Sequence, residues 1–93
     1  MLKMTLNIKG RVQKVGYRYS VVNFVIESGL GLTGHVRNLS DGSVEVVAEG
    51  SLEELKELHR FCLQGPPTSQ VREIDQDLAP IHSRSFTEFR ILT

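Results

Sequence analysis

The chain has 93 residues, of which 40% are hydrophobic and 24% are charged, and its 11 basic side chains are balanced by 11 acidic ones. This length fits a single domain spanning residues 1–93, with one hydrophobic core. A formal net charge of zero and a sequence pI near 6.8 disfavour a nucleic-acid-binding protein, because neutralising phosphates requires an excess of basic residues.

Alternation of apolar and polar residues predicts a first strand over residues 4–8, which Gly10 is expected to end. Glycines at both ends mark residues 10–16 as a loop. Apolar residues then recur at helical spacing from Tyr17 to Ser28-Gly29. Several residues of this segment are β-branched and lower the helix propensity, so we expect tertiary packing to hold the helix.

Two alternating segments, residues 32–38 and 44–48, flank Ser40-Asp41-Gly42 and predict a β-hairpin. Ser51 and Glu54 have the spacing of a capping box, which begins a second helix. The apolar face of this helix is expected to carry Leu52, Leu55, Leu58 and Cys62.

After the second helix, Gly65-Pro66-Pro67 breaks the chain, and two further strands are predicted over residues 71–78 and 86–92. The order is β-α-β-β-α-β with one extra strand before the last. This order indicates an α+β fold of the ferredoxin-like, split βαβ type, with two helices packed on one face of a mainly antiparallel sheet.

A single cysteine, Cys62, excludes an internal disulfide, and its place on an apolar helix face favours a core residue over a nucleophile. The three histidines lack the spacing of paired metal ligands, so we expect no metal site. The sequence shows neither an export signal nor 18 consecutive apolar residues. We therefore expect a cytoplasmic protein, a monomer with no membrane partner.

In the predicted fold, the first two strands run parallel and flank the third, so their C-terminal ends share one edge of the sheet. We therefore expect the loop of residues 10–16 to lie near the side chain of Asn38. Two strand spacings separate their backbones by about 10 Å, which one small ligand and a side chain can fill.

A glycine-flanked loop that leads into a helix presents unpaired backbone N–H groups and attracts anions. In the first helical turn, the Arg18 guanidinium could add bidentate hydrogen bonds to a phosphate. The alternative is a loop shaped for packing, with Arg18 in solvent. The spacing matches neither a Walker loop nor a dinucleotide-binding fingerprint, so nucleotide binding is not indicated.

Residues 10–18, Gly-Arg-Val-Gln-Lys-Val-Gly-Tyr-Arg, resemble the first motif of the acylphosphatase family, G-x-V-Q-G-V-x-[FY]-R, except at Lys14. Residues 34–44 match the second motif, G-x-V-x-N-x-x-x-G-x-V. The resemblance covers essentially the whole chain. It implies a small bacterial-type acylphosphatase, which hydrolyses acyl phosphates to a carboxylate and inorganic phosphate without a metal or cofactor.

The resemblance assigns water positioning to Asn38 and phosphate binding to the Arg18 guanidinium and a loop of amides. The loop comprises Gln13, Lys14, Val15, Gly16, Tyr17 and Arg18. The carboxylate leaving group, with a pKa of about 4, departs as an anion without a general acid. Positioning and charge stabilisation then suffice for catalysis. Neither motif offers a strong base, so a phosphate oxygen of the substrate is a candidate proton acceptor.

Lys14 leaves three interpretations open. If the position requires a positive φ, lysine costs roughly 1–2 kcal/mol and reshapes the loop. Its ammonium could instead add a second positive charge that tightens substrate and product alike. It could also simply point into solvent.

Two other functions compete with the enzyme. One is a phosphate- or acyl-phosphate-binding module on the same fold, with weak or no turnover. The other is a single-stranded RNA binder, which would need exposed aromatic residues on the central strands to stack bases. The predicted first and third strands contain none.

Overall fold

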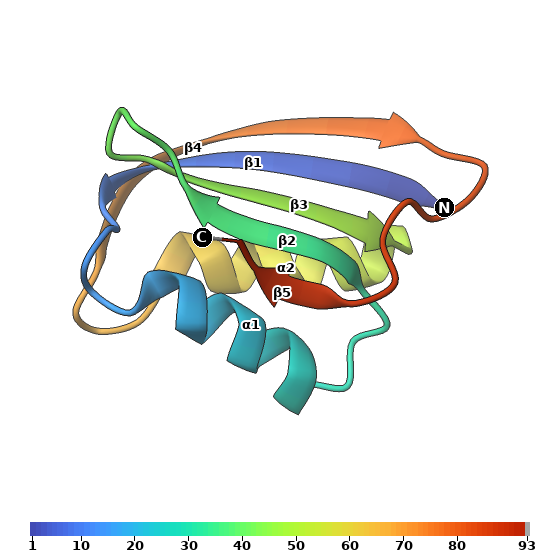
Figure 1. Ribbon diagram of the computed structural model, residues 1–93, viewed down its shortest axis with the longest axis horizontal. Helices are drawn as coiled ribbons and strands as arrows, with labels where there is room; N and C mark the ends of the chain where they lie inside the picture. The colour runs from blue at the N-terminus through green and yellow to red at the C-terminus, as the bar shows by residue number, and fades with distance from the viewer. Residues whose placement is uncertain (93) are drawn as a thin grey trace.

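The computed structural model describes residues 1–92 and shows a sheet with both helices on one face (Figure 1). In chain order the elements are β1 (Leu2–Arg11), α1 (Tyr17–Glu27), β2 (Thr33–Asn38), β3 (Val44–Gly50), α2 (Leu52–Gln64), β4 (Gln70–Pro80) and β5 (Phe89–Ile91). The strand order is β4-β1-β3-β2-β5. β5 pairs parallel with β2, and the other three pairings are antiparallel. The predicted ferredoxin-like arrangement is confirmed.

β1 is longer than predicted, and the expectation that Gly10 ends it is wrong. The register with β4 shifts between Lys9 and Gly10, and Gly10 has φ 134°. A Cβ at this position would collide with the carbonyl oxygen of Gln70. Glycine therefore allows a β-bulge here, and the strand continues to Arg11.

The additional strand is the last one, β5, rather than the one before it. β4 takes the edge beside β1, as the fourth strand of a split βαβ fold does, and β5 adds to the opposite edge beside β2. β5 spans only three residues because the chain from residue 81 to residue 88 forms a connection instead of the predicted start of a strand.

The core lies between the sheet and the helices. Inward-facing residues of β1 and β3 pack against the buried faces of both helices. The helices contribute Val21 and Val25 of α1, and Leu55, Leu58 and Cys62 of α2, the last three as predicted. The rings of Phe24 and Phe61 stack with centroids 4.4 Å apart and join the two helices. Packing thus holds the valine-rich α1 helical, as expected.

Leu52 does not belong to this core, although the helical pattern predicted it there. Its exposed fraction is 44%. As the first residue of α2 it lines the open groove between α2 and β4, to which Leu63 and Leu78 also contribute. Neither helix in residues 1–92 has the length and apolar character needed to cross a membrane.

One carboxylate, that of Glu49, is fully buried and anchors the connection to β5. Its oxygens accept hydrogen bonds from the Thr33 hydroxyl at 2.9 Å and from the backbone N–H groups of Ser85 at 2.8 Å and Phe86 at 3.1 Å. Burial alone would raise the pKa of Glu49, but these hydrogen bonds and the charge of Arg84 hold it below its ordinary value of 4.5.

Replacing Glu49 with glutamine is expected to lower the free energy of unfolding by about 1–3 kcal/mol near neutral pH. Because the folded-state pKa is depressed, this stabilisation is present above the unfolded-state pKa and is lost as the pH falls through the folded-state pKa. Urea unfolding at neutral and acid pH measures the difference. Glu88→Gln, at a carboxylate whose side chain is 64% exposed, is the matched control. A difference in unfolding free energy between Glu49→Gln and the wild type that stayed the same at acid pH would contradict this explanation.

Candidate active site

The loop after β1 and the residues after β2 are in direct contact. Nε2 of Gln13 donates hydrogen bonds to the carbonyl oxygens of Leu39, at 2.8 Å, and Ser43, at 2.9 Å. Leu39 directly follows Asn38, the last residue of β2. The loop and Asn38 are therefore brought together as the parallel course of β1 and β2 requires. Sequence reasoning had assigned only the backbone amide of Gln13 to the site and missed its side chain, which joins the two segments.

The loop has the backbone conformation of an anion-binding concavity. Lys14 has φ 63° and Gly16, the N-cap of α1, has φ 78°, so left-handed residues lie on both sides of Val15. Alternation of this kind turns successive N–H groups toward a common centre. Within the described chain, the N–H groups of residues 13–18 donate no hydrogen bond. Six consecutive amides, at the positive end of the α1 dipole, are thus free to bind an anion. We call these six residues the cradle.

Contacts on the outer side of the cradle hold its shape. The Thr68 hydroxyl donates to the carbonyl oxygen of Val15 at 2.7 Å. The Tyr17 hydroxyl donates to the carbonyl oxygen of Cys62 at 2.6 Å, and its ring is buried. Tyr17 can therefore offer the site its backbone amide but not its side chain, and burial raises the pKa of its hydroxyl above the ordinary value. The contact of Thr68 was not foreseen, because 53 residues separate it from Val15.

Arg18 lies half-buried in the first turn of α1. It lines a pocket of about 290 Å³ together with Lys14, Gly16 and Tyr19. No hydrogen bond or ion pair joins its guanidinium to another residue of the described chain, and no carboxylate lines the pocket. Its donors are thus available for charge-assisted hydrogen bonds to an anion on the neighbouring amides.

The carboxamide of Asn38 lies at the C-terminal end of β2. Its Oδ1 is closed off from solvent and has no hydrogen-bond partner within residues 1–92, whereas Nδ2 is not among the buried unpaired atoms. Nδ2 also forms no hydrogen bond to a described residue, so it is the end of the amide that reaches solvent. The side chain can therefore donate to a small polar molecule at the end of β2.

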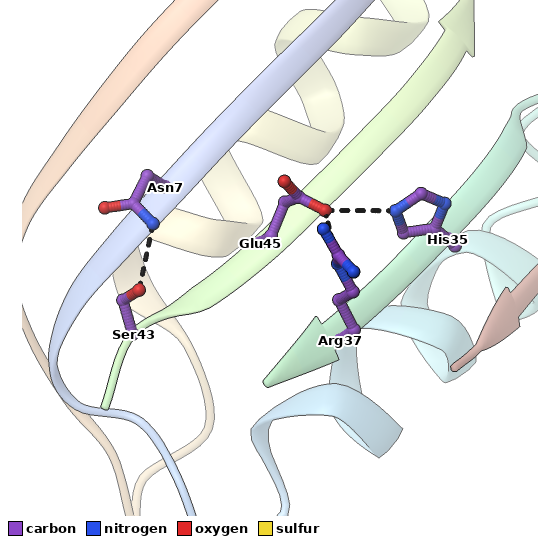
Figure 2. A network of polar contacts seen from close by, with 5 residues as sticks. All are labelled: Asn7, His35, Arg37, Ser43 and Glu45. Atoms are coloured by element: carbon purple, nitrogen blue, oxygen red, sulfur yellow. Dashed lines mark hydrogen bonds and ion pairs between the residues drawn. The ribbon is translucent and has the colours of Figure 1, made fainter. Parts of the chain in front are cut away.

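The outer face of the sheet carries polar contacts that fix the β2–β3 hairpin (Figure 2). Nδ2 of Asn7 donates to the Ser43 hydroxyl at 2.9 Å, and that hydroxyl donates to Asp41 at 2.6 Å. Hydrogen bonds from the hydroxyl and the backbone N–H of Ser43 lower the pKa of Asp41. Asp41 thus has the turn role that the sequence indicated. The carbonyl oxygen of Ser43 also accepts a hydrogen bond from Gln13, so Ser43 links the hairpin to the cradle.

His35, Arg37 and Glu45 form a second polar group on this face (Figure 2). Glu45 lies 2.7 Å from Nε of Arg37 and 3.2 Å from Nε2 of His35. Burial would raise the pKa of Glu45, but the contacts with Arg37 and His35 lower it below its ordinary value. His35 thus serves the sheet and not the cradle.

Two other kinds of catalytic group are a metal site and a cysteine nucleophile. Among residues 1–92, no cluster of three or more His, Cys, Asp and Glu side chains is placed to hold a metal ion. Cys62 is fully buried in the core, as predicted, and burial raises the pKa of its thiol to about 12. A thiol with this pKa is not ionised near neutral pH and does not serve as a nucleophile.

Replacing Gln13 with leucine is expected to lower the free energy of unfolding by about 1–2 kcal/mol, because the carbonyl oxygen of Leu39 loses its side-chain donor. The amide hydrogens of the cradle should also exchange faster. Urea unfolding and hydrogen exchange followed by mass spectrometry measure the two effects. Gln64→Leu, at an exposed position at the end of α2, should change neither. Unchanged exchange in the Gln13 variant would show that this side chain does not fix the cradle.

The chain is similar in sequence and in fold to known acylphosphatases. A model of the acylphosphatase family matches residues 4–91. The acylphosphatase of Pasteurella multocida is 45% identical over 92 residues, which cover 98% of either chain. The crystal structure of the Bacillus subtilis acylphosphatase superposes with a TM-score of 0.90 and 32% identity over 100% of both chains. An acylphosphatase structure from Coxiella burnetii gives a TM-score of 0.83 and 33% identity, covering 97% of this chain and 90% of that one. Because the family model matches residues 4–91 and these relatives share the fold over nearly the whole length, the chain belongs to the acylphosphatase family.

Proposed function

We propose that this chain hydrolyses the carboxyl–phosphate bond of acyl phosphates at the cradle, releasing a carboxylate and inorganic phosphate. The observation that carries the proposal is the set of six unpaired amides beside the free guanidinium of Arg18. Family membership and the name acylphosphatase of full-length relatives support the same reaction. All these groups come from one chain, so we expect a single copy to be active.

The cradle and Arg18 bind the phosphate group. Its non-bridging oxygens accept hydrogen bonds from the amides and from the fork of guanidinium donors. In the loose transition state of phosphoryl transfer, negative charge remains spread over these oxygens. Donors that are already aimed at them stabilise this charge without reorganisation, because the outer contacts of Gln13 and Thr68 keep the loop in place.

The departure of the leaving group requires no catalytic residue of the protein. The bond between phosphorus and the acyl oxygen breaks, and its electron pair leaves on a carboxylate with a pKa of about 4. Such an anion is stable at neutral pH without protonation, so no general acid is required. The buried thiol of Cys62 and the His35 imidazole, which is bound to Glu45, therefore have no step to perform.

Water is the nucleophile, and Asn38 positions it. Nδ2 of Asn38 donates to the water oxygen and holds it opposite the leaving oxygen, in line with the bond that breaks. A new bond forms between the water oxygen and phosphorus, and the water proton passes to a phosphate oxygen. Positioning requires only a fixed donor, which agrees with the free Nδ2 end of this carboxamide.

Arg18→Ala is expected to abolish phosphate binding and turnover together, because the guanidinium contacts the same oxygens in substrate, transition state and product. Arg18→Lys should recover part of the affinity but little of the rate, since an ammonium lacks the planar fork. Benzoyl phosphate hydrolysis and calorimetric titration with inorganic phosphate measure both effects. Arg60→Ala, on the exposed surface of α2, removes the same charge elsewhere and should match the wild type. Phosphate affinity that survived in Arg18→Ala would contradict the assignment.

Asn38→Ala is expected to reduce kcat by about 100-fold or more while leaving the affinity for inorganic phosphate close to that of the wild type. The reason is that Asn38 acts on the water and not on the phosphate. Steady-state kinetics with phosphate as a competitive inhibitor separate the two constants. Asn23→Ala, at an exposed asparagine of α1, is the matched control. A loss of phosphate affinity in the Asn38 variant would place this side chain on the phosphate and overturn its role.

A further inference from the structure

Lys14 occupies the cradle in a backbone conformation that favours glycine. Its φ is 63°, and it is the only residue other than glycine with a positive φ in the described chain. Glycine adopts this conformation freely, whereas a residue with a side chain adopts it at a cost. Of the three interpretations that the sequence left open, the structure thus establishes that the backbone of this lysine is strained.

No structural contact accounts for a lysine at this point. The side chain is exposed, and within residues 1–92 it forms no hydrogen bond or ion pair. Lys9, by contrast, forms an ion pair, with its Nζ 3.0 Å from the carboxylate of Asp75. The ammonium of Lys14 therefore has no partner in the described part of the chain that would hold it away from the cradle.

The charges around Lys14 point to an anion. Lys14 and Arg18 line the same pocket, whose other lining residues are Val12, Gly16, Tyr17 and Tyr19. The charged residues in this lining, Lys14 and Arg18, are both basic. A hollow lined by one sign of charge, beside six free amides, attracts anions and concentrates them there.

We propose that Lys14 is a second cation of the cradle, which tightens binding of the phosphate group in substrate and product alike without accelerating the chemical step. This inference rests on the proposed function in taking the cradle as the phosphate site. The ammonium stands on a flexible stem and meets charge that is present before, during and after the reaction. Uniform binding of this kind lowers KM and strengthens inhibition by phosphate, but it leaves kcat unchanged.

Three variants separate charge from backbone strain. Lys14→Gly removes both the charge and the strain. Lys14→Asn removes the charge with a residue that tolerates left-handed backbone, and Lys14→Arg keeps the charge. Lys56→Asn, at an exposed lysine of α2, is the control for the loss of one positive charge from the whole molecule. Calorimetric titration with inorganic phosphate reads the affinity without requiring turnover, and benzoyl phosphate kinetics give KM and kcat.

We expect Lys14→Gly and Lys14→Asn to weaken phosphate binding equally, by about fivefold at low ionic strength, and to raise KM by a similar factor. This loss of phosphate affinity should largely disappear at about 1 M salt, where charges are screened. Lys14→Arg and Lys56→Asn should bind phosphate like the wild type, and kcat should be unchanged throughout.

Wild-type affinity in both Lys14→Gly and Lys14→Asn would overturn the proposal and make Lys14 a solvated side chain. An effect seen in only one of these two variants, or a change confined to kcat, would also overturn it, because backbone conformation and not charge would then be responsible. Absence of any wild-type turnover, with phosphate still bound and still sensitive to Lys14, would instead overturn the proposed hydrolysis and leave this inference standing.

Discussion

The site depends on the antiparallel pairing of both β1 and β2 with the strand between them, β3. This pairing makes β1 and β2 parallel and brings their C-terminal ends to the same edge of the sheet. β1 leads into the cradle and β2 ends at Asn38, so strand order brings together the proposed phosphate donors and the carboxamide that we propose positions water. The two hydrogen bonds of Gln13 then fix the distance between these ends.

Stability and function are divided between the two sides of the cradle loop. Outward contacts, from Gln13, Thr68 and the buried Tyr17, use side-chain donors and carbonyl acceptors to hold the loop. The backbone N–H groups of residues 13–18 have no acceptor among residues 1–92. A bound anion can accept hydrogen bonds from these groups and so satisfy them. A loop held in this way loses little entropy when phosphate binds.

Sequence reasoning predicted the parts of the structure that local patterns determine. Helical periodicity and the capping box at Ser51 located α2, alternation located the β2–β3 hairpin, and the two motifs indicated Arg18 and Asn38. The burial of Glu49 could not be foreseen, because its partners Ser85 and Phe86 lie more than 30 residues away. The bulge at Gly10 likewise depends on its approach to β4. Contacts between distant segments leave no periodic trace in the sequence, so they were missed.

We propose that amides, one guanidinium and one carboxamide suffice to hydrolyse an acyl phosphate. The most direct test is the rate of benzoyl phosphate hydrolysis by the purified protein in excess EDTA, measured against the spontaneous rate, with phosphate binding determined on the same sample. We expect rapid hydrolysis that EDTA does not reduce. Phosphate binding without hydrolysis above the spontaneous rate would contradict it and make the protein a phosphate-binding module.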